Sequence, residues 1–167
     1  MMGLCYHEAA GGVRMLIIAG SLRELDFEQL AQVYDYERND AAEFYDYLSQ
    51  CFFTVKGSVY CLWQVEGHYR SALRLEPYQD GLLLTGLETA PQWRRRGYAK
   101  GLMGAVLQWL GGDSHRKIYS HIRFDNKPSL AVHQRCGFRR IMDHAVLLDG
   151  TVSSQIGTFL CTLGASV

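Results

Sequence analysis

The chain lacks an excess of charge of either sign. Its 167 residues include 17 Lys and Arg against 17 Asp and Glu, so the formal net charge at pH 7 is +0 with histidine neutral. No long-range field is therefore expected to attract nucleic acid, and any attraction for an anion must come from a local patch. We predict no nucleic-acid partner, and binding to a polyanion that persists at high salt would contradict this prediction.

Long apolar runs and linker-like segments are also lacking. The longest early apolar run, from Met15 to Ala19, is far shorter than the roughly 20 residues of a membrane-spanning helix, and too short for a signal core. We predict one domain over residues 1–167, located in the cytoplasm, with no membrane partner and with homodimer formation left open. The first dozen residues, 1–12, carry no strong pattern, and we expect a loosely ordered N-terminal extension there.

The cysteines show no spacing that indicates a disulfide framework or a metal site. Their number is odd, and none of them stands in a CxxC pair or at Cys/His ligand spacing. The five are Cys5, Cys51, Cys61, Cys136 and Cys161. We expect reduced, mostly buried thiols and no bound metal.

The N-terminal half predicts one strand, two helices and three further strands. Residues 13–19 form an apolar, partly branched run typical of a strand. Asp26 and Asp40 each stand at an expected helix N-cap, with Gln29 or Glu43 three residues later and apolar residues at helical spacing. The strands predicted at 58–65, 68–75 and 82–89 are separated by short turns, which can only join antiparallel neighbours.

The C-terminal half alternates between helical and extended patterns. Residues 99–110 predict a helix, 117–124 a strand, and 127–136 a short helix that ends at Gly137. Residues 140–163 predict two strands that turn at Asp149 and Gly150. The predicted fold class is α+β, with a central mixed, mostly antiparallel β-sheet flanked by about four helices.

The stretch PQWRRRGYAKGLM places three consecutive arginines, Arg94, Arg95 and Arg96, at a strand-to-helix turn. Such a turn exposes unpaired backbone N–H groups at the positive end of the helix dipole, which suits a phosphate. Gly97 and Ala99 would let the phosphate approach the backbone, and arginine offers forked donors. The alternative is a solvated basic turn in which the small residues only allow helix–sheet packing. Neither the GxxxxGKS/T loop nor the GxGxxG dinucleotide fingerprint is present.

A second segment, NKPSLAVHQRCGF at 126–138, strengthens the phosphate hypothesis. Arg94, Gly97 and Ala99 fit the pattern Gln/Arg-x-x-Gly-x-Gly/Ala, Thr89-Ala90-Pro91 is similar to V-x-P, and the second segment ends in a Gly-Phe pair. Together these features resemble the GNAT superfamily of acetyl-CoA-dependent N-acetyltransferases over residues 82–138. The resemblance implies acetyl-CoA as the acyl donor and no need for a metal.

The resemblance also implies which residues bind the donor. The strand at 82–89 would offer backbone groups of Leu87 and Thr89 to the pantetheine arm. Asn126 would reach the pantetheine or adenylate portion, assisted by Ser129, although Asn126 also suits a helix N-cap. The pyrophosphate would be held, chiefly through main-chain N–H groups, by Arg94, Arg95, Arg96, Gly97, Tyr98 and Ala99.

In similar proteins the strand at 82–89 parts from its neighbour and opens a wedge for the acyl chain. Gly86 lies inside this strand, where a glycine predicts a bulge or a close backbone approach. The wedge and the bulge are therefore expected at the same place.

Catalytic roles are implied for His133 and Glu88. Many family members carry a tyrosine at the place of His133, where it protonates the CoA thiolate, and branches similar to phosphinothricin acetyltransferases carry histidine. A histidine of pKa ~6.5 is only partly protonated at neutral pH, but a neutral imidazole can still donate one N–H. Glu88 is the first candidate for the base that deprotonates the amine, and His121 is the reserve. The alternatives are a packed helix residue for His133 and a solvent-facing strand residue for Glu88.

The acceptor side is expected near residues 33–48, which contain five acidic residues, one arginine and four tyrosines. In look-alike proteins the first two helices border the acceptor site, and a negative aromatic wall suits a cationic amine. Tyr34, Tyr36 and Asp40 are candidates to bind the acceptor, with His121, although a solvated helix face explains most of the segment. We predict an N-acetyltransferase in which a small-molecule or peptide amine attacks the thioester directly. The alternative is a non-catalytic acyl-CoA-binding module.

Overall fold

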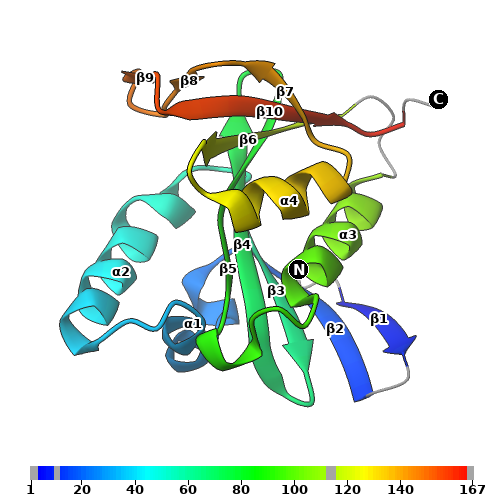
Figure 1. Cartoon of the computed structure of the whole chain (residues 1–167). Coiled ribbons are helices and arrows are strands. Elements are labelled where there is room, and N and C mark those ends of the chain that lie inside the picture. The colour runs from blue at the N-terminus through cyan, green and yellow to red at the C-terminus, as the bar shows by residue number, and fades with distance from the viewer. Residues whose placement is uncertain (1–3, 10–11, 112–115, 165–167) are drawn as a thin grey trace.

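The computed structural model describes residues 4–9, 12–111 and 116–164, and its main element is an eight-stranded sheet (Figure 1). The strand order is β1-β2-β3-β4-β5-β6-β10-β7, and of the pairs in this sheet β5·β6 is parallel while the others are antiparallel. The strands are β1 Leu4–Ala9, β2 Gly12–Ala19, β3 Val59–Val65, β4 His68–Tyr78, β5 Gly81–Thr89, β6 Lys117–Arg123, β7 Arg139–Met142 and β10 Ile156–Thr162. The predicted mixed, mostly antiparallel sheet is confirmed.

Four α-helices accompany the sheet in the described part of the chain, as predicted. They are α1 Phe27–Val33, α2 Arg38–Gln50, α3 Tyr98–Leu110 and α4 Lys127–Arg135, with short 3-10 helices at Leu22–Glu24, Phe52–Thr54 and Pro91–Trp93. Asp26 caps α1 as predicted, because its carboxylate accepts the backbone N–H of Gln29 (3.1 Å). Asp40 is not an N-cap: α2 begins earlier, after Glu37, and Asp40 lies in its first turn.

The two ends of the chain differ from the sequence expectation. Leu4–Ala9, for which no element was predicted, pairs with β2 as an antiparallel edge strand. Residues 140–163 form more than two strands: β7 and β10 join the main sheet, and β8 Ala145–Val146 pairs with β9 Val152–Ser153 in a separate ribbon. The predicted turn at Asp149 and Gly150 connects β8 to β9, with Gly150 N–H donating to the Leu147 carbonyl (2.9 Å).

Most of the core lies in two apolar layers, one on each face of the sheet, and Figure 1 shows the helices that flank the sheet. Side chains alternate between the faces along each strand, so that Cys61 of β3 contributes to one layer and Leu62 to the other. The first layer contains the buried side of α3, with α4 residues packed against it. The second contains Leu30 of α1 and Leu48 of α2. The sheet thus separates an α3/α4 face from an α1/α2 face.

Within the described residues, no helix is long and apolar enough to cross a membrane, and no cluster of His, Cys, Asp and Glu suits a metal ion. Four cysteines in the described part of the chain are free thiols. Cys61 and Cys161 are buried, Cys136 is partly buried and Cys51 is exposed.

Candidate active site

The site is built around a fork between β5 and β6. Parallel pairing joins residues 81–84 of β5 to residues 117–120 of β6 and ends at the Leu84–Ser120 pair. Beyond this pair β5 shifts register against β4, and Gly86 adopts a φ of 59°. The hydroxyl of Tyr34 donates to the Gly86 carbonyl oxygen (2.6 Å), which fixes the bulged backbone from the α1/α2 side. The bulge expected at Gly86 is therefore present, and it coincides with the place where the strands part.

A cavity of about 220 Å³ occupies this fork. It brings together side chains of β5, β6 and α4 that are far apart in the sequence. Its lining residues are Leu84, Thr85, Gly86, Leu87, Ser120, His121, Asn126, Ser129 and His133. Five predicted site residues, Leu87, His121, Asn126, Ser129 and His133, therefore meet in one place.

The arginine turn connects the end of β5 to α3. Arg94 Nε donates to the Thr89 carbonyl oxygen (3.2 Å), and Arg94 also pairs with the Glu88 carboxylate (3.2 Å). Arg94 therefore ties the turn back to the strand that precedes it. Arg95 and Arg96 are exposed, and the Arg96 guanidinium lies 4.7 Å from the centre of the Trp93 ring. These two side chains are the arginines available to an anion at the surface.

The first turn of α3 is open. Its N-cap residue is Gly97, at a φ of 82°, and a Cβ added there would meet no heavy atom within 4 Å. Among the described residues, we find no side chain that accepts a hydrogen bond from the backbone N–H groups of Tyr98 or Ala99. Glycine is required here by the left-handed backbone and not by a neighbouring protein atom. The helix start therefore keeps the free N–H groups that an anion needs.

Glu88 lies at the edge of the fork and has two partners. Its Oε1 accepts the Arg94 guanidinium and the backbone N–H of Thr89 (3.1 Å). The side chains of Arg94 and Glu88 are 54% and 38% exposed, respectively. Glu88 does not belong to the lining of the 220 Å³ cavity.

His133 lies on α4 with only 2% of its surface exposed. Its Nδ1 is 2.8 Å from the Ser129 carbonyl oxygen, and its Nε2 is 3.0 Å from the Ser120 hydroxyl oxygen. The ring also contacts the Phe138 ring at a centroid distance of 5.0 Å. Burial lowers the pKa of His133 below its ordinary range, so the neutral imidazole is favoured.

His121 lies on β6 and projects from the opposite face to Ser120, because successive strand residues alternate. Its ring packs edge-on against the Tyr78 ring at 5.3 Å, and Nε2 is buried without a hydrogen-bond partner among the described residues. Burial lowers the pKa of His121, so its neutral form is favoured as well.

Asn126 caps α4, since its side-chain oxygen accepts the backbone N–H of Ser129 (3.2 Å). The capping alternative considered for Asn126 is therefore present in the structure. A side-chain amide also has N–H donors, which this contact leaves unused.

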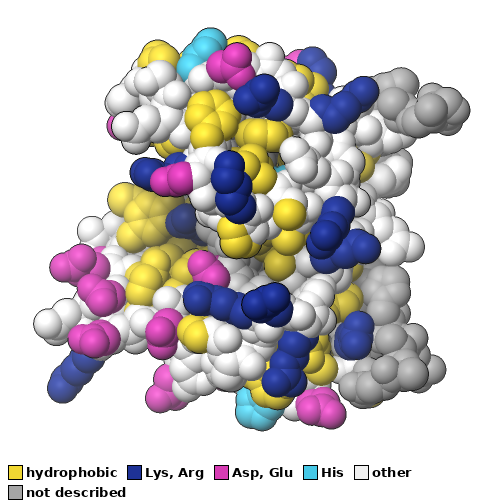
Figure 2. Space-filling model, viewed as in Figure 1, with side chains coloured by type: hydrophobic (Ala, Val, Ile, Leu, Met, Phe, Trp, Pro, Cys, Tyr) yellow, Lys and Arg dark blue, Asp and Glu magenta, His cyan; other side chains and the backbone are white. Residues whose placement is uncertain are grey.

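The α1/α2 face carries an aromatic cluster next to the fork. Tyr34 is partly buried: it accepts from the Tyr60 hydroxyl (2.6 Å), and desolvation of its hydroxyl raises its pKa to about 12. Tyr36 stacks on Tyr34 at 5.3 Å and is itself exposed, as is Asp40. The Arg74 guanidinium lies 5.3 Å from the centre of the Tyr47 ring. Acidic side chains gather over the region of α2, at the lower left in Figure 2.

Sequence reasoning missed Ser120 and Arg74. A serine within a predicted strand carries no signal of its own, and Arg74 stood in an alternating strand where a charged residue suggests solvent exposure. Arg74 instead lies within reach of Gly86, because a Cβ on Gly86 would be 2.8 Å from Arg74 Nε.

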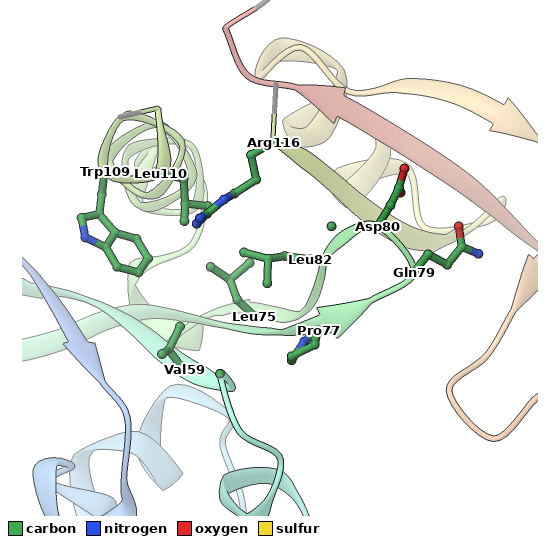
Figure 3. A pocket seen from close by; sticks show the side chains of 11 residues that line it. Val59, Leu75, Pro77, Gln79, Asp80, Leu82, Trp109, Leu110 and Arg116 are labelled. Atoms are coloured by element: carbon green, nitrogen blue, oxygen red, sulfur yellow. The ribbon is translucent and has the colours of Figure 1, made fainter. Parts of the chain in front are cut away.

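A larger cavity of about 570 Å³ lies at the other end of α3 (Figure 3). Trp109 and Leu110 border it from the helix, Leu75 and Leu82 from the sheet, and Asp80 from the turn between β4 and β5. None of the predicted site residues lines it. Five of the predicted site residues line the smaller cavity in the fork instead.

Comparison with known proteins gives the family. The model of the acetyltransferase (GNAT) family matches residues 21–138. A search of curated proteins found no match.

Solved structures show the same fold at low sequence identity. The ribosomal-protein-S18-alanine N-acetyltransferase from Escherichia coli has a TM-score of 0.64 at 13% identity, covering 92% of this chain and 97% of that one. A spermidine N-acetyltransferase chimera from Vibrio cholerae has a TM-score of 0.65 at 15% identity, with coverages of 88% and 95%. An IAA acetyltransferase from Bacillus cereus has a TM-score of 0.57 at 15% identity, with coverages of 89% and 99%. With a family model that spans most of its length, and with this fold, the chain belongs to the GNAT acetyltransferase family.

Proposed function

We propose that this protein transfers an acetyl group from acetyl-CoA to a primary amine, by direct attack of the amine on the thioester. The observation that carries the proposal is the open first turn of α3 beside the fork of β5 and β6. An anionic group would bind at the helix start, and the chain attached to it would extend into the fork, whose lining comes from β5, β6 and α4.

Donor binding falls to the α3/α4 face. The backbone N–H groups of Gly97, Tyr98 and Ala99 would hold the pyrophosphate, with Arg95 and Arg96 adding charge. Arg94 would act mainly by fixing the turn, because its donors already contact Thr89 and Glu88.

The pantetheine arm would lie along the parted edge of β5. Backbone groups of Leu87, and the Asn126 amide assisted by Ser129, would contact it. Thr89 would contribute only after a rearrangement, because its N–H donates to Glu88 and its carbonyl oxygen accepts from Arg94. In this position the thioester would reach the 220 Å³ cavity. Backbone N–H groups at the fork would polarise its carbonyl, an effect that usually contributes strongly to acyl transfer.

The amine would approach from the α1/α2 face. Tyr34, Tyr36 and Asp40 border this side, and acidic residues of α2 would favour a cationic acceptor, which is a small-molecule or peptide amine. Two of the solved neighbours are named for N-acetylation of spermidine and of a ribosomal-protein alanine, and both of these acceptors are amines.

A base must remove a proton from the amine, since an amine of pKa ~10.4 is almost fully protonated at neutral pH. Glu88 and His121 are the two candidates. Glu88 is paired with Arg94 and the Thr89 N–H, whereas His121 lines the cavity with a neutral ring and an unbonded Nε2. The geometry therefore favours His121, with Glu88 acting through water as the weaker alternative.

Substitution of the two candidates separates their roles. We expect His121→Gln to lower kcat/KM for the amine by roughly 10²-fold or more, and to remove the acidic limb of its pH profile. Glu88→Gln should lower kcat/KM less than about tenfold, because it removes only a surface ion pair. The reverse ranking would make Glu88 the base.

The proposed function is tested by a thermal-shift titration with acetyl-CoA, followed by a free-thiol assay with a panel of primary amines. Acetyl-CoA should raise the Tm by mass action, and at least one amine should accelerate release of CoA with formation of its N-acetyl product. A Tm shift without transfer to any amine would support the alternative, a non-catalytic acyl-CoA-binding module. Absence of any shift would contradict both functions.

A further inference from the structure

Ser120 and His133 form a buried hydroxyl–imidazole pair in the wall of the fork cavity. Ser120 is 2% exposed and is the last residue of β6 that pairs with β5. Its Oγ lies 3.0 Å from His133 Nε2, within the range typical of a serine nucleophile and its base. Both residues line the cavity.

The contacts of His133 determine where its proton lies. A carbonyl oxygen can only accept, so the 2.8 Å contact with the Ser129 carbonyl requires the proton on Nδ1. In the neutral ring, Nε2 then carries no proton, and its lone pair is directed at the Ser120 hydroxyl. The neutral ring is the favoured form because burial lowers the pKa of His133. The same carbonyl orients the ring, as the third member of a catalytic triad does.

The other buried serines of the described chain lack this arrangement. Ser58 Oγ has no hydrogen-bond partner, and Ser71 Oγ donates to the Glu88 carbonyl oxygen (2.6 Å). Ser120 has a competing acceptor in the Leu84 carbonyl oxygen, but at 3.3 Å this contact is longer than the one with His133. Ser120 is therefore the buried serine with a base beside it.

We propose that Ser120 is a nucleophile that takes the acyl group from bound acyl-CoA when no amine is present, which gives the protein a thioester hydrolase activity. The proposal rests on the donor binding described under Proposed function. It differs from the direct transfer proposed there, because the acyl group passes through the enzyme.

Two balanced steps make up the hydrolysis. Ser120 Oγ forms a bond to the thioester carbon as the C–S bond breaks, and its proton passes through His133 Nε2 to the departing sulfur. Water then attacks the Ser120 ester and gives its proton to His133 Nε2, which returns it to Oγ as the carboxylic acid leaves. The net reaction converts acyl-CoA and water into CoA and a carboxylic acid, and it needs no further reactant.

The geometry of the fork suits these steps. Strand pairing ends at Leu84 and Ser120, so the backbone groups of Thr85, Gly86 and Leu87 that face β6 are not used in that ladder. Unpaired N–H groups beside a nucleophile are the donors that stabilise an oxyanion.

The experiment uses acetyl-CoA without any amine. We expect the purified protein to release CoA steadily, and acid-quenched samples to carry one acetyl group on the peptide containing Ser120. Ser120→Ala and His133→Gln should each lower CoA release by roughly 10²-fold or more and abolish the labelled peptide. Ser58→Ala is the matched control, because it removes a buried serine hydroxyl that has no partner, and it should release CoA like the unsubstituted protein.

The acetyl-CoA thermal shift is measured for every variant, so that loss of folding or of donor binding is recognised. If the unsubstituted protein shows no shift, the proposed function fails, and this inference fails with it. If the shift is present but no CoA is released, or if Ser120→Ala releases CoA as fast as the unsubstituted protein, only the hydrolase proposal is overturned. An acetyl group found on a residue other than Ser120 overturns it as well.

Discussion

Neutral His133 has one ring N–H, and it donates this N–H to the Ser129 carbonyl oxygen, one helical turn earlier in α4. The sequence suggested that this N–H would be donated to the CoA sulfur. In the observed arrangement Nε2 faces Ser120, so a direct hydrogen bond from His133 to a thiolate would first require breaking an existing contact. Ser120 lines the cavity with its hydroxyl 3.0 Å from His133 Nε2, which is why we assign the reactive atom to Ser120 and the supporting role to His133.

Gly97 offers a test of donor binding with a matched control. Gly97 and Gly67 have similar backbones, with φ of 82° and 79°, and a Cβ at either position meets no atom within 4 Å. We expect Gly97→Ala and Gly67→Ala to cost a similar ~1 kcal/mol of folding free energy, since both force alanine into the left-handed region. Of the two, Gly97→Ala should reduce the Tm shift given by acetyl-CoA, because its methyl group stands over the N–H groups of α3. An equal response of both variants to acetyl-CoA would place the pyrophosphate elsewhere.

At the scale of elements, the fork depends on a close approach of β5 and β6 at the start of their parallel pairing. Gly81 pairs with Lys117, and a Cβ on Gly81 would lie 2.1 Å from the Lys117 carbonyl oxygen. The two strands can therefore meet only if this position is glycine. The bulge at Gly86, five residues later, lies where the strands part again, and Gly86 lines the cavity in the fork.

Substitution of Gly81 tests how firmly this pairing holds the fork. Gly81→Ala should lower the free energy of unfolding by about 3 kcal/mol, because backbone atoms have to move. Gly104→Ala, on the exposed side of α3 where a Cβ meets nothing within 4 Å, should instead raise it by about 0.5–1 kcal/mol. Urea unfolding of both variants measures the difference. A Gly81→Ala protein as stable as the unsubstituted one would mean that β5 and β6 can separate without cost.

At the scale of the whole molecule, the balanced net charge is the sum of two separate patches of opposite sign. Acidic side chains gather over the α2 region, while Lys and Arg side chains gather over the region of α3 and α4 (Figure 2). Because the Debye length is about 8 Å at physiological salt, each surface acts locally. The proposed cationic acceptor and anionic donor would therefore be attracted to different patches of a chain whose formal net charge is +0.

The stability of the whole fold should depend on pH through its buried histidines. Burial lowers the pKa of His121 and His133, whereas unfolding returns each to about 6.5. Below about pH 6.5 the unfolded state binds more protons than the folded state, so the free energy of unfolding falls as the pH falls towards the folded pKa values. Above this window the two histidines add no pH dependence.

Urea unfolding at several pH values from about pH 8 to about pH 5 measures this slope. His133→Gln should flatten it, and an unchanged slope would mean that His133 titrates normally in the fold. Glu76 contributes with the opposite sign, because burial raises its pKa and its stabilisation is lost as the pH rises through the folded value. Subtracting the slope of the His133→Gln variant from that of the unsubstituted protein removes this contribution, since Glu76 is present in both.

The sequence by itself determined the family, the order of most elements and the strand-to-helix turn at which we propose donor binding. Each of these depends on residues close together in the chain: Arg94, Gly97 and Ala99 stand within one turn, and Asp26 caps the helix that follows it. Local spacing fixes such features because backbone geometry links near neighbours directly. The edge strand Leu4–Ala9 and the division of residues 140–163 into four strands escaped prediction, since partner strands and not local pattern create them.

Only the tertiary structure decided which side chains meet in the fork. Ser120 of β6 contacts His133 of α4, and Glu88 forms an ion pair with Arg94. His121 projects from the face of the sheet opposite to Ser120. These contacts depend on strand register, on the bulge at Gly86 and on how α4 packs against the sheet. A one-residue change of register would exchange the two faces of β6, so no pattern within a single segment can specify them.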